Sequence, residues 1–300
     1  MGFSFFERFA GFGRFTRICL GAALAVSPLS AQASRPKTAP AGPPLQTTAA
    51  TVSQFEDGPG LEGSQKLVVG ESGFFRFSVV NFKTADTGKV QLTGRVQVFD
   101  SRGTPIAPVD EVPIATKLSE EDKDWRPRFH SQFQLPAIAP PGTYKVHYEV
   151  TDEQSHQKAS GDTNFAVDGR DVAASDTLTV RHIDFYRSAD DEMPLKVAAY
   201  RPGEMVWVRF DITGYKYGDQ NAMDVSYDVT VTDAAGKQLF AQENAAVEKS
   251  QAFYPQPWVP GSFSLTLQQD TAKATYSVAI TAHDAMGKQN VTEKADFRVE

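Results

Sequence analysis

The sequence contains one strand-like stretch twice, at a constant spacing along the chain. Residues 70–79, GESGFFRFSV, align without a gap with residues 203–212, GEMVWVRFDI, an offset of 133 residues. The same offset links further pairs downstream: Asp100 and Asp233, Gly103 and Gly236, Trp125 and Trp258, Pro127 and Pro260. After a one-residue slip, Tyr144 matches Tyr276 and Asp152 matches Asp284. An internal duplication of this length predicts two copies of one domain.

Within each copy, short runs alternate between apolar and polar side chains. Phe75, Phe77 and Val79 alternate with Arg76 and Ser78, which is the period of a half-buried strand. Turn sequences separate these runs, and in each copy one turn begins with Asp and ends with Gly: 100–103 and 233–236. No stretch shows a helical period with caps. The sequence therefore predicts an all-β chain of two tandem antiparallel β-sandwich, immunoglobulin-like domains.

The N-terminus has the three parts of an export signal. Arg8, Arg14 and Arg17 supply a basic region, residues 18–29 form a short apolar run, and residues 31–33, Ala-Gln-Ala, fit a signal-peptidase site. The apolar run is too short to span a bilayer. We expect a cleaved signal peptide over residues 1–33, and an uncleaved membrane anchor is the alternative.

The rest of the chain divides by composition and by the duplication. Residues 34–50 are rich in Pro, Ala and Thr and predict an extended, disordered spacer. The first sandwich is expected over residues 51–168 and the second over residues 177–300. Residues 169–176 form a short polar linker between them.

Charge and cysteine content limit the function classes. The formal net charge is -7 and the sequence holds no basic stripe, which argues against nucleic acid as a partner. Cys19, the only cysteine, lies in the predicted signal peptide. The mature chain would then have neither a disulfide nor a reactive thiol. Burial of apolar side chains must hold it together, which favours a periplasmic or secreted protein of a bacterium.

Two short motifs resemble known sandwich families. Residues 141–146, PGTYKV, resemble the E–F corner of immunoglobulin and fibronectin type III domains, in which a Tyr hydroxyl bonds back to the backbone. Residues 200–204 and 261–265 resemble the macroglobulin-type sandwich domains of secreted bacterial proteins. The cysteines of antibody domains and the thioester motif of the macroglobulins are absent. These resemblances imply adhesion, spacing or partner binding rather than chemistry.

The sequence offers no catalytic or metal-binding set. The pair His182 and Asp184 falls on one strand face and is the best metal candidate, but it lacks a third ligand, so a solvated face is favoured. No Gly-x-Ser-x-Gly elbow and no glycine-rich phosphate loop occur. We therefore expect no enzyme activity, no metal and no cofactor.

Two acidic clusters leave a hydrolase open as an alternative. The first holds Glu120, Glu121, Asp122 and Asp124, and the second holds Asp190, Asp191 and Glu192. Paired carboxylates serve as acid and base in glycoside hydrolysis or as calcium ligands. Neither cluster has the spacing of a calcium loop and neither is duplicated, so solvated loop charges are the favoured interpretation.

Aromatic residues in loops are the best ligand-binding candidates. Trp125 and Trp258 hold matching positions, each two residues before a proline, and Phe82 matches Tyr215. Further aromatic residues lie nearby in the second copy: Tyr217, Phe253 and Tyr254. A Trp lid over the end of each sandwich is the favoured interpretation, and an exposed platform for sugar rings or a peptide is the alternative.

Together these features predict an exported, non-catalytic binding or scaffolding protein of two duplicated sandwiches. Its partner would be a protein or a polysaccharide of the cell envelope, and the mature chain would have no transmembrane span. A carbohydrate-binding accessory module that uses the loop aromatics is the first alternative. A hydrolase that uses the acidic loops is the second.

Overall fold

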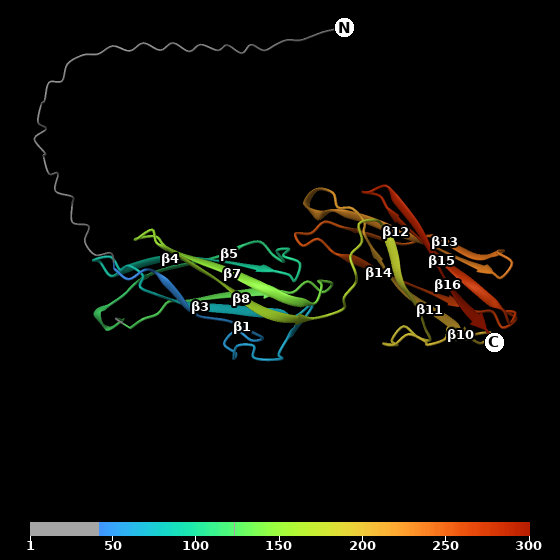
Figure 1. Ribbon diagram of the computed structural model, residues 1–300, viewed down its shortest axis with the longest axis horizontal. Coiled ribbons are helices and arrows are strands. Elements are labelled where there is room, and N and C mark those ends of the chain that lie inside the picture. Colours follow the sequence, from blue (N-terminus) through green and yellow to red (C-terminus); the bar gives the residue numbers. More distant parts are fainter. Residues whose placement is uncertain (1–41, 123) are drawn as a thin grey trace, which may run out of the picture. The chain divides into compact units, whose positions relative to one another are not determined.

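The computed structural model describes residues 42–122 and 124–300, and the regular secondary structure of these residues is almost entirely antiparallel β-sheet (Figure 1). Helix in this part of the chain is limited to two short 3-10 turns, η1 (Glu120–Asp122) and η2 (Asp219–Asn221). The predicted all-β fold class is confirmed. The predicted signal peptide, residues 1–33, lies outside the described residues. None of the described helices is long and apolar enough to cross a membrane.

The duplication extends to the topology of the sheets. The first sandwich consists of β1 (Gln46–Ser53), β2 (Leu67–Val68), β3 (Ser72–Val80), β4 (Lys89–Phe99), β5 (Asp110–Lys117), β6 (Arg128–Gln134), β7 (Gly142–Asp152) and β8 (Lys158–Asp168). The second consists of β9 (Thr179–Tyr186), β10 (Ala199–Tyr200), β11 (Met205–Thr213), β12 (Met223–Asp233), β13 (Gln238–Ser250), β14 (Trp258–Thr266), β15 (Thr275–Asp284) and β16 (Gln289–Val299).

Each sandwich pairs a three-stranded sheet with a five-stranded sheet. The strand orders are β1-β3-β6 and β2-β8-β7-β4-β5 in the first, and β9-β11-β14 and β10-β16-β15-β12-β13 in the second. Every strand of the first sandwich thus has a counterpart eight strands later. The short strands β2 and β10 pair in parallel with β8 and β16, whereas the other ladders are antiparallel.

One predicted boundary is wrong by a few residues. Residues 46–50 were expected in the disordered spacer, but they begin β1, which pairs with β3 from Gln46 opposite Val80 onward. The proline-rich composition that suggested a spacer ends at Pro44, and the Thr and Ala residues that follow are free to join a ladder. Residues 34–41 of the predicted spacer lie outside the described part of the chain.

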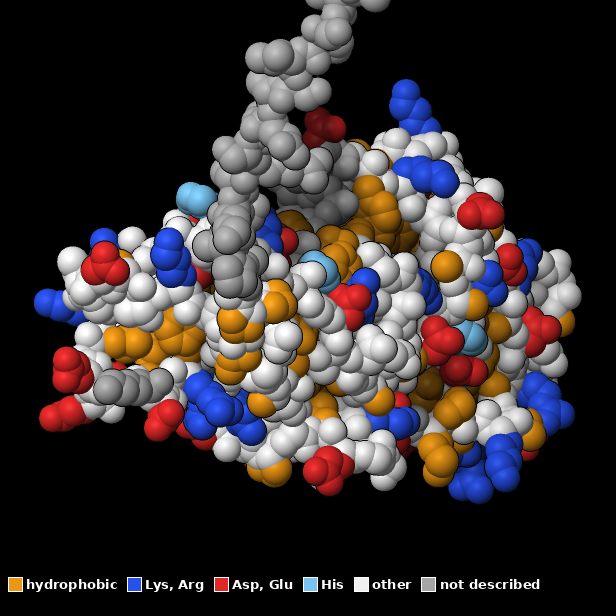
Figure 2. Space-filling view, turned by 60° about the vertical axis from the view of Figure 1, so that its left-hand side comes forward, with side chains coloured by type: hydrophobic (Ala, Val, Ile, Leu, Met, Phe, Trp, Pro, Cys, Tyr) orange, Lys and Arg blue, Asp and Glu red, His pale blue; other side chains and the backbone are white. Residues whose placement is uncertain are grey.

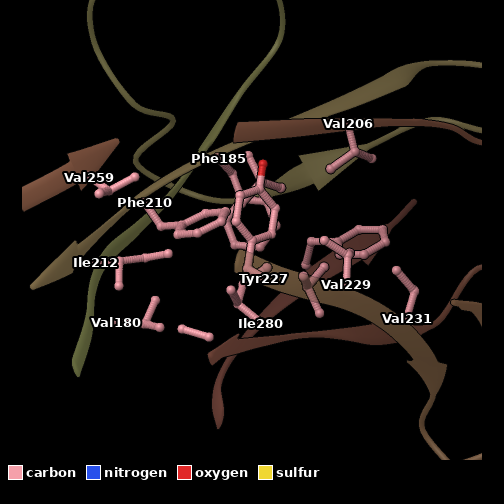
Figure 3. Close-up of a cluster of buried hydrophobic side chains, with 14 of the residues drawn as sticks. Val180, Phe185, Val206, Phe210, Ile212, Tyr227, Val229, Val231, Val259 and Ile280 are labelled. Carbon is pink, nitrogen blue, oxygen red and sulfur yellow. The ribbon is translucent and has the colours of Figure 1, made fainter. Parts of the chain in front are cut away.

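The two cores follow from the alternating pattern. Phe75, Phe77 and Val79 of β3 are at most 1% exposed, and they pack against Tyr148 of β7, whose ring lies 5.1 Å from that of Phe75. In the second sandwich Phe210 of β11 meets Tyr227 of β12 at 4.9 Å (Figure 3). Each core is a separate cluster of buried apolar side chains, so each sandwich has its own hydrophobic core.

A tyrosine corner stabilises both sandwiches. The Tyr144 hydroxyl donates to the carbonyl of Pro140 at 2.8 Å, as the resemblance to immunoglobulin-type domains predicted. Tyr276 makes the same bond to the carbonyl of Ala272, also at 2.8 Å. Burial raises the pKa of the Tyr144 hydroxyl, so this group stays a hydrogen-bond donor at physiological pH.

Aspartate side chains fix the same two turns in each copy. Asp100 accepts from the backbone N–H of Arg102 and Thr104, and Asp233 accepts from the corresponding N–H groups, as expected for an Asp-to-Gly turn. Asp152, fully buried, accepts from the N–H of Lys83 at 2.7 Å. Its counterpart Asp284 accepts from the N–H of Lys216, which ties the connection after the third strand to the turn after the seventh.

A β-bulge also recurs at the same place in the first strand of each copy. The β1 ladder shifts between Thr48 and Thr51, and Ala49 takes a φ of 53°. The β9 ladder shifts between Asp184 and Arg181, and His182 takes a φ of 52°. Positive φ is uncommon for residues other than glycine. The bulge holds Ala in one copy and His in the other, so it is caused by the strand pairing rather than by the side chain at this position.

Candidate functional site

A pocket of the described residues lies in the first sandwich, between the β3–β4 loop and the β5–β6 loop. We call it the Trp125 pocket, and its volume is about 740 Å³. Its apolar wall includes Phe82 and Trp125, whose rings meet edge to face at 5.8 Å. Its acidic lining is supplied by four carboxylates: Asp86, Glu120, Asp122 and Asp124. The structure therefore brings together one predicted aromatic site residue and most of the first acidic cluster.

Backbone hydrogen bonds hold the two loops of the pocket together. The N–H of Leu118 donates to the carbonyl of Gly88 at 2.8 Å, and the N–H of Gly88 donates to the carbonyl of Ala85 at 2.8 Å. Gly88 has a φ of +78°, and a Cβ there would lie 2.4 Å from the Leu118 oxygen. Only glycine fits this close approach, so the β3–β4 and β5–β6 loops are packed together rather than independent of each other.

The 3-10 turn η1 positions Trp125 and uses one of the carboxylates. Asp122 accepts from the backbone N–H of Ser119 at 2.8 Å and from its hydroxyl at 2.7 Å. These two bonds lower the pKa of Asp122, which keeps it ionised. The N–H of Trp125 donates to the Asp122 carbonyl at 3.0 Å, so the capped turn places the indole at the pocket wall.

The remaining carboxylates of the pocket are available to a ligand. Asp86, Glu120 and Asp124 are exposed, and none of them pairs with another side chain among the described residues. Arg126 is the one basic side chain in the described lining, so acidic groups predominate. Figure 2 shows a face of the molecule on which acidic and basic side chains are interspersed. The pocket thus combines an aromatic wall with exposed hydrogen-bond acceptors.

The matching place in the second sandwich is closed. Trp258 is 7% exposed, and the guanidinium of Arg170 lies 5.2 Å from its ring. Tyr215, the counterpart of Phe82, is buried and donates its hydroxyl to the carbonyl of Gln256 at 2.5 Å. Tyr217 donates to the same carbonyl, and its ring packs on Tyr215 at 5.5 Å. Of the aromatic residues matched in the sequence, Phe82 and Trp125 line the Trp125 pocket, whereas Tyr215 and Trp258 are buried.

The other predicted aromatic residues lie away from the Trp125 pocket. The side chain of Phe253 is 49% exposed, and its carbonyl accepts from the amide of Asn221. The Tyr254 hydroxyl donates to Asp100 at 2.9 Å, and its ring packs against the first hydrophobic core. Burial, followed by this bond, raises the pKa of Tyr254. These rings do not extend the platform around Trp125.

His182 and Asp184, the candidate metal pair for which a solvated face was the favoured interpretation, do not bond to each other. His182 instead meets Asp211 of β11, with its Nδ1 2.7 Å from Oδ2, and the guanidinium of Arg170 binds both oxygens of the same carboxylate. Asp211 is fully buried. Among the described residues no three His, Cys, Asp or Glu side chains are grouped to hold a metal ion. Spacing within β9 could not reveal this contact, because Arg170 and Asp211 are far apart in the sequence.

The second acidic cluster stabilises its own loop. Asp191 accepts from the hydroxyl and N–H of Ser188 and from the N–H of Arg187. These bonds lower the pKa of Asp191. The guanidinium of Arg209 also binds the carbonyl of Asp191, at 2.7 Å. Residues 188–191 thus form a capped turn, and the carboxylate of Asp191 is already occupied.

Comparison with known proteins does not identify a family. No protein-family model matches the sequence, and no curated protein matches it. Among solved structures, the C-terminal domain of the Streptococcus agalactiae AgI/II polypeptide BspA is 10% identical, with 85% of this chain and 100% of that chain covered and a TM-score of 0.29. The C-terminal domain of the Streptococcus pyogenes antigen I/II-family protein AspA is 10% identical, with 85% and 99% covered and a TM-score of 0.30.

A third similar structure is a family 123 glycoside hydrolase from Clostridium perfringens. It is 8% identical, with 41% of this chain and 27% of that chain covered and a TM-score of 0.29. At these TM-scores none of the three similarities bears on function. The resemblance to immunoglobulin-type sandwiches therefore stands at the level of the fold, where the sheets and the two tyrosine corners support it.

Proposed function

We propose that this chain is an exported, non-catalytic binding protein that takes its ligand in the Trp125 pocket. One observation carries the proposal: the duplicated aromatic pair is closed off in the second sandwich but lines an open, acidic pocket in the first. A purely structural Trp lid needs no free carboxylates beside it. Aromatic walls with a few convergent polar groups are the usual form of a ligand site.

The chemistry of the pocket favours a ligand that donates hydrogen bonds. Asp86, Glu120 and Asp124 offer acceptors, and the indole of Trp125 offers an apolar face and edge. A sugar presents both hydroxyl donors and an apolar ring face, so the carbohydrate-binding alternative gains most from this arrangement. A basic peptide segment is the other ligand of an envelope partner that fits, because its side chains are cationic donors.

The experiment is a binding titration followed by tryptophan fluorescence and by calorimetry. A panel of neutral polysaccharides and one of lysine-rich peptides are added to the wild-type chain and to Trp125→Ala. The matched control is Trp258→Phe, which alters the counterpart indole outside the pocket. We expect a response that Trp125→Ala removes and Trp258→Phe preserves. No response to either panel, or a response that Trp125→Ala leaves unchanged, would contradict the proposal.

Export is a separate part of the proposal with its own test. It is supported by the basic residues, the apolar run and the Ala-Gln-Ala site in residues 1–33. N-terminal sequencing of the chain recovered from a bacterial envelope fraction should give Ser34 as the first residue. An intact N-terminus in the membrane fraction would favour the anchor, and a chain found only in the cytoplasm would refute export.

The non-catalytic part is tested against the acidic-loop hydrolase. The carboxylates of Asp122 and Asp191 cap turns of their own loops, which supports structural roles. Wild-type chain and the double variant Asp122→Asn with Asp190→Asn are assayed on the polysaccharides that bind. We expect no hydrolysis by either. Hydrolysis by the wild type that the double variant loses would establish the enzyme instead.

A further inference from the structure

We propose that the free edge of β13 pairs with β13 of a second copy of this chain, so that two five-stranded sheets join across a two-fold axis. This inference is independent of the Trp125 pocket. β13 is the last strand of its sheet and pairs only with β12 in the described structure. It is also the longest strand, with 13 residues, and contains neither Pro nor Gly. Open edges of this kind are templates for strand addition.

The other edge strands among the described residues are each protected. β2 and β10 have two residues each. β5 contains Pro113, and β14 contains Pro260 and Gly261. β1 and β9 carry the bulges at Ala49 and His182, and β6 presents Arg128 and His130 outward. Short length, proline, bulges and charges are the known devices that prevent edge pairing. β13 has a bulge around Asn244, a second register shift opposite Val231 and Thr232, and charges at Glu243, Glu248 and Lys249. It has no proline, however, and residues 246–250 pair regularly with β12.

The ladder with β12 shows which peptide groups of this segment are free. The N–H of Ala285 donates to the carbonyl of Asp224 at 3.0 Å, so the peptide groups of Asp224 turn toward β15. Successive residues of an antiparallel strand turn their peptide groups to opposite sides. Val225 and Tyr227 therefore face β13, where they are opposite Glu248 and Ala246.

The free groups of β13 follow by the same alternation. Glu248 and Ala246 use their N–H and C=O groups within the sheet, so those of Ala245, Val247 and Lys249 face the open edge. Val247 is the middle one of the three, and its side chain is 57% exposed. An added strand would thus find donors and acceptors at every second residue, with an exposed apolar side chain at the centre.

The same segment is complementary to itself, which selects a second copy as the occupant. In an antiparallel pair centred on Val247, Val247 is opposite its own copy, Ala245 is opposite Lys249, and Ala246 is opposite Glu248. No like charges meet in this register. Centring on Glu248 or Lys249 would place like charges face to face, and centring toward the N-terminus would run into the bulge at Asn244. The outward-facing N–H and C=O groups of the two β13 strands then oppose each other in a closed, isologous contact.

The test measures the oligomeric state of the full chain by sedimentation equilibrium over a range of concentrations. We expect a monomer–dimer equilibrium. Val247→Pro removes the outward N–H at the two-fold axis without removing a bond to β12, and should weaken dimerisation by about 10-fold or more. Val247→Thr keeps the N–H and the branched Cβ and is the matched control for folding. A wild-type chain that stays monomeric, or a dimer that Val247→Pro leaves unchanged, would overturn the proposal.

A crosslink tests the register separately. In the proposed pairing, the two Val247 Cα atoms would lie about 5.5 Å apart, within disulfide range. In a Cys19→Ser background, Val247→Cys should form an intermolecular disulfide on mild oxidation. Glu248→Cys, whose copies would not be opposite each other, should crosslink several-fold less. Equal crosslinking of the two variants would rule out this register.

Discussion

Arg170 binds both carboxylate oxygens of Asp211, with Nη1 2.8 Å from Oδ1 and Nη2 2.5 Å from Oδ2. The Asp211 side chain is fully buried, whereas that of Arg170 is about half exposed. The segment that follows β8 is therefore attached to the outer face of β11 by a planar, two-bond contact. The same guanidinium lies over Trp258, so one side chain neutralises the buried carboxylate and covers the indole.

Removing this arginine should destabilise the second sandwich. Arg170→Ala leaves Asp211 buried with His182 as its remaining partner, at a cost of about 2–4 kcal/mol in the free energy of unfolding. Urea denaturation followed by fluorescence measures it. Lys158→Ala removes the exposed bond to Glu149 and is the control, with an expected loss below about 1 kcal/mol. Equal losses for the two variants would show that the buried ion pair contributes no more to the free energy of unfolding than the exposed one.

The two tyrosine corners should contribute similar amounts of stability. Tyr144→Phe and Tyr276→Phe each remove one hydroxyl whose 2.8 Å bond satisfies a backbone carbonyl. We expect each variant to lose about 1–2 kcal/mol of unfolding free energy, because the carbonyl is left without its partner. Thermal and urea unfolding check this. A loss at Tyr144 alone would mean that the corner has lost its role in the second copy.

Acid should destabilise the first sandwich through Asp152. Burial alone would raise the pKa of this carboxyl, but hydrogen bonds from Ser155, Lys83 and Gln154 outweigh it and lower the pKa below the ordinary value. The stabilisation is therefore complete above the unfolded-state pKa, about 3.9, and is lost as the pH falls from there through the folded-state pKa.

The measurement is the free energy of unfolding between pH 7 and pH 2.5. Asp152→Asn should be less stable than wild type at pH 7, and its stability should fall less steeply below about pH 4. Parallel wild-type and Asp152→Asn curves would show that Asp152 does not titrate with unfolding.

The two cores place a large and a small residue on opposite strands at one matching position. In the first sandwich a Cβ on Gly94 would lie 2.5 Å from the ring of Phe129. The matching residues of the second are Tyr227 and Gly261, because Phe77 pairs with Phe129 and its counterpart Phe210 pairs with Gly261. The Tyr227 hydroxyl reaches the neighbouring Ser262 and donates to its carbonyl at 2.6 Å. The small residue stands on the five-stranded sheet in one copy and on the three-stranded sheet in the other.

This exchange predicts strong coupling between Gly94 and Phe129. Gly94→Tyr should overpack the core, and Phe129→Gly should leave a cavity, each at about 2–4 kcal/mol. The double variant copies the second sandwich and should recover at least about 1–2 kcal/mol relative to the sum. A double-mutant cycle of urea unfolding measures the coupling. Additive losses would mean that the large and small residues at these two positions do not compensate each other in the first sandwich.

The sequence was sufficient for the parts of the fold that depend on local pattern. The alternation of Phe75, Phe77 and Val79 placed the buried face of β3, and the Asp-to-Gly turns followed from backbone chemistry. β5 and β13 were missed because edge strands are largely exposed and show little alternation. The start of β1 was missed because Thr and Ala after a proline-rich run have no distinctive period.

The candidate site was only half visible in the sequence. Trp125 and the carboxylates that precede it form a local cluster, so they were found, but Asp86 comes from a loop more than thirty residues earlier. The matched pair Trp125 and Trp258 suggested one role for both. Their different surroundings depend on Arg170, whose contact with Asp211 joins distant parts of the sequence.

The bulge that recurs at Ala49 and His182 has a practical consequence for protein design. The backbone of the first sandwich already adopts the geometry that, in the second, turns an imidazole toward a carboxylate on the adjacent strand. Ser78 occupies the position that Asp211 holds. Grafting His and Asp into these two positions would test how far a side-chain pair can be transplanted between twin scaffolds, with the original serving as its own reference.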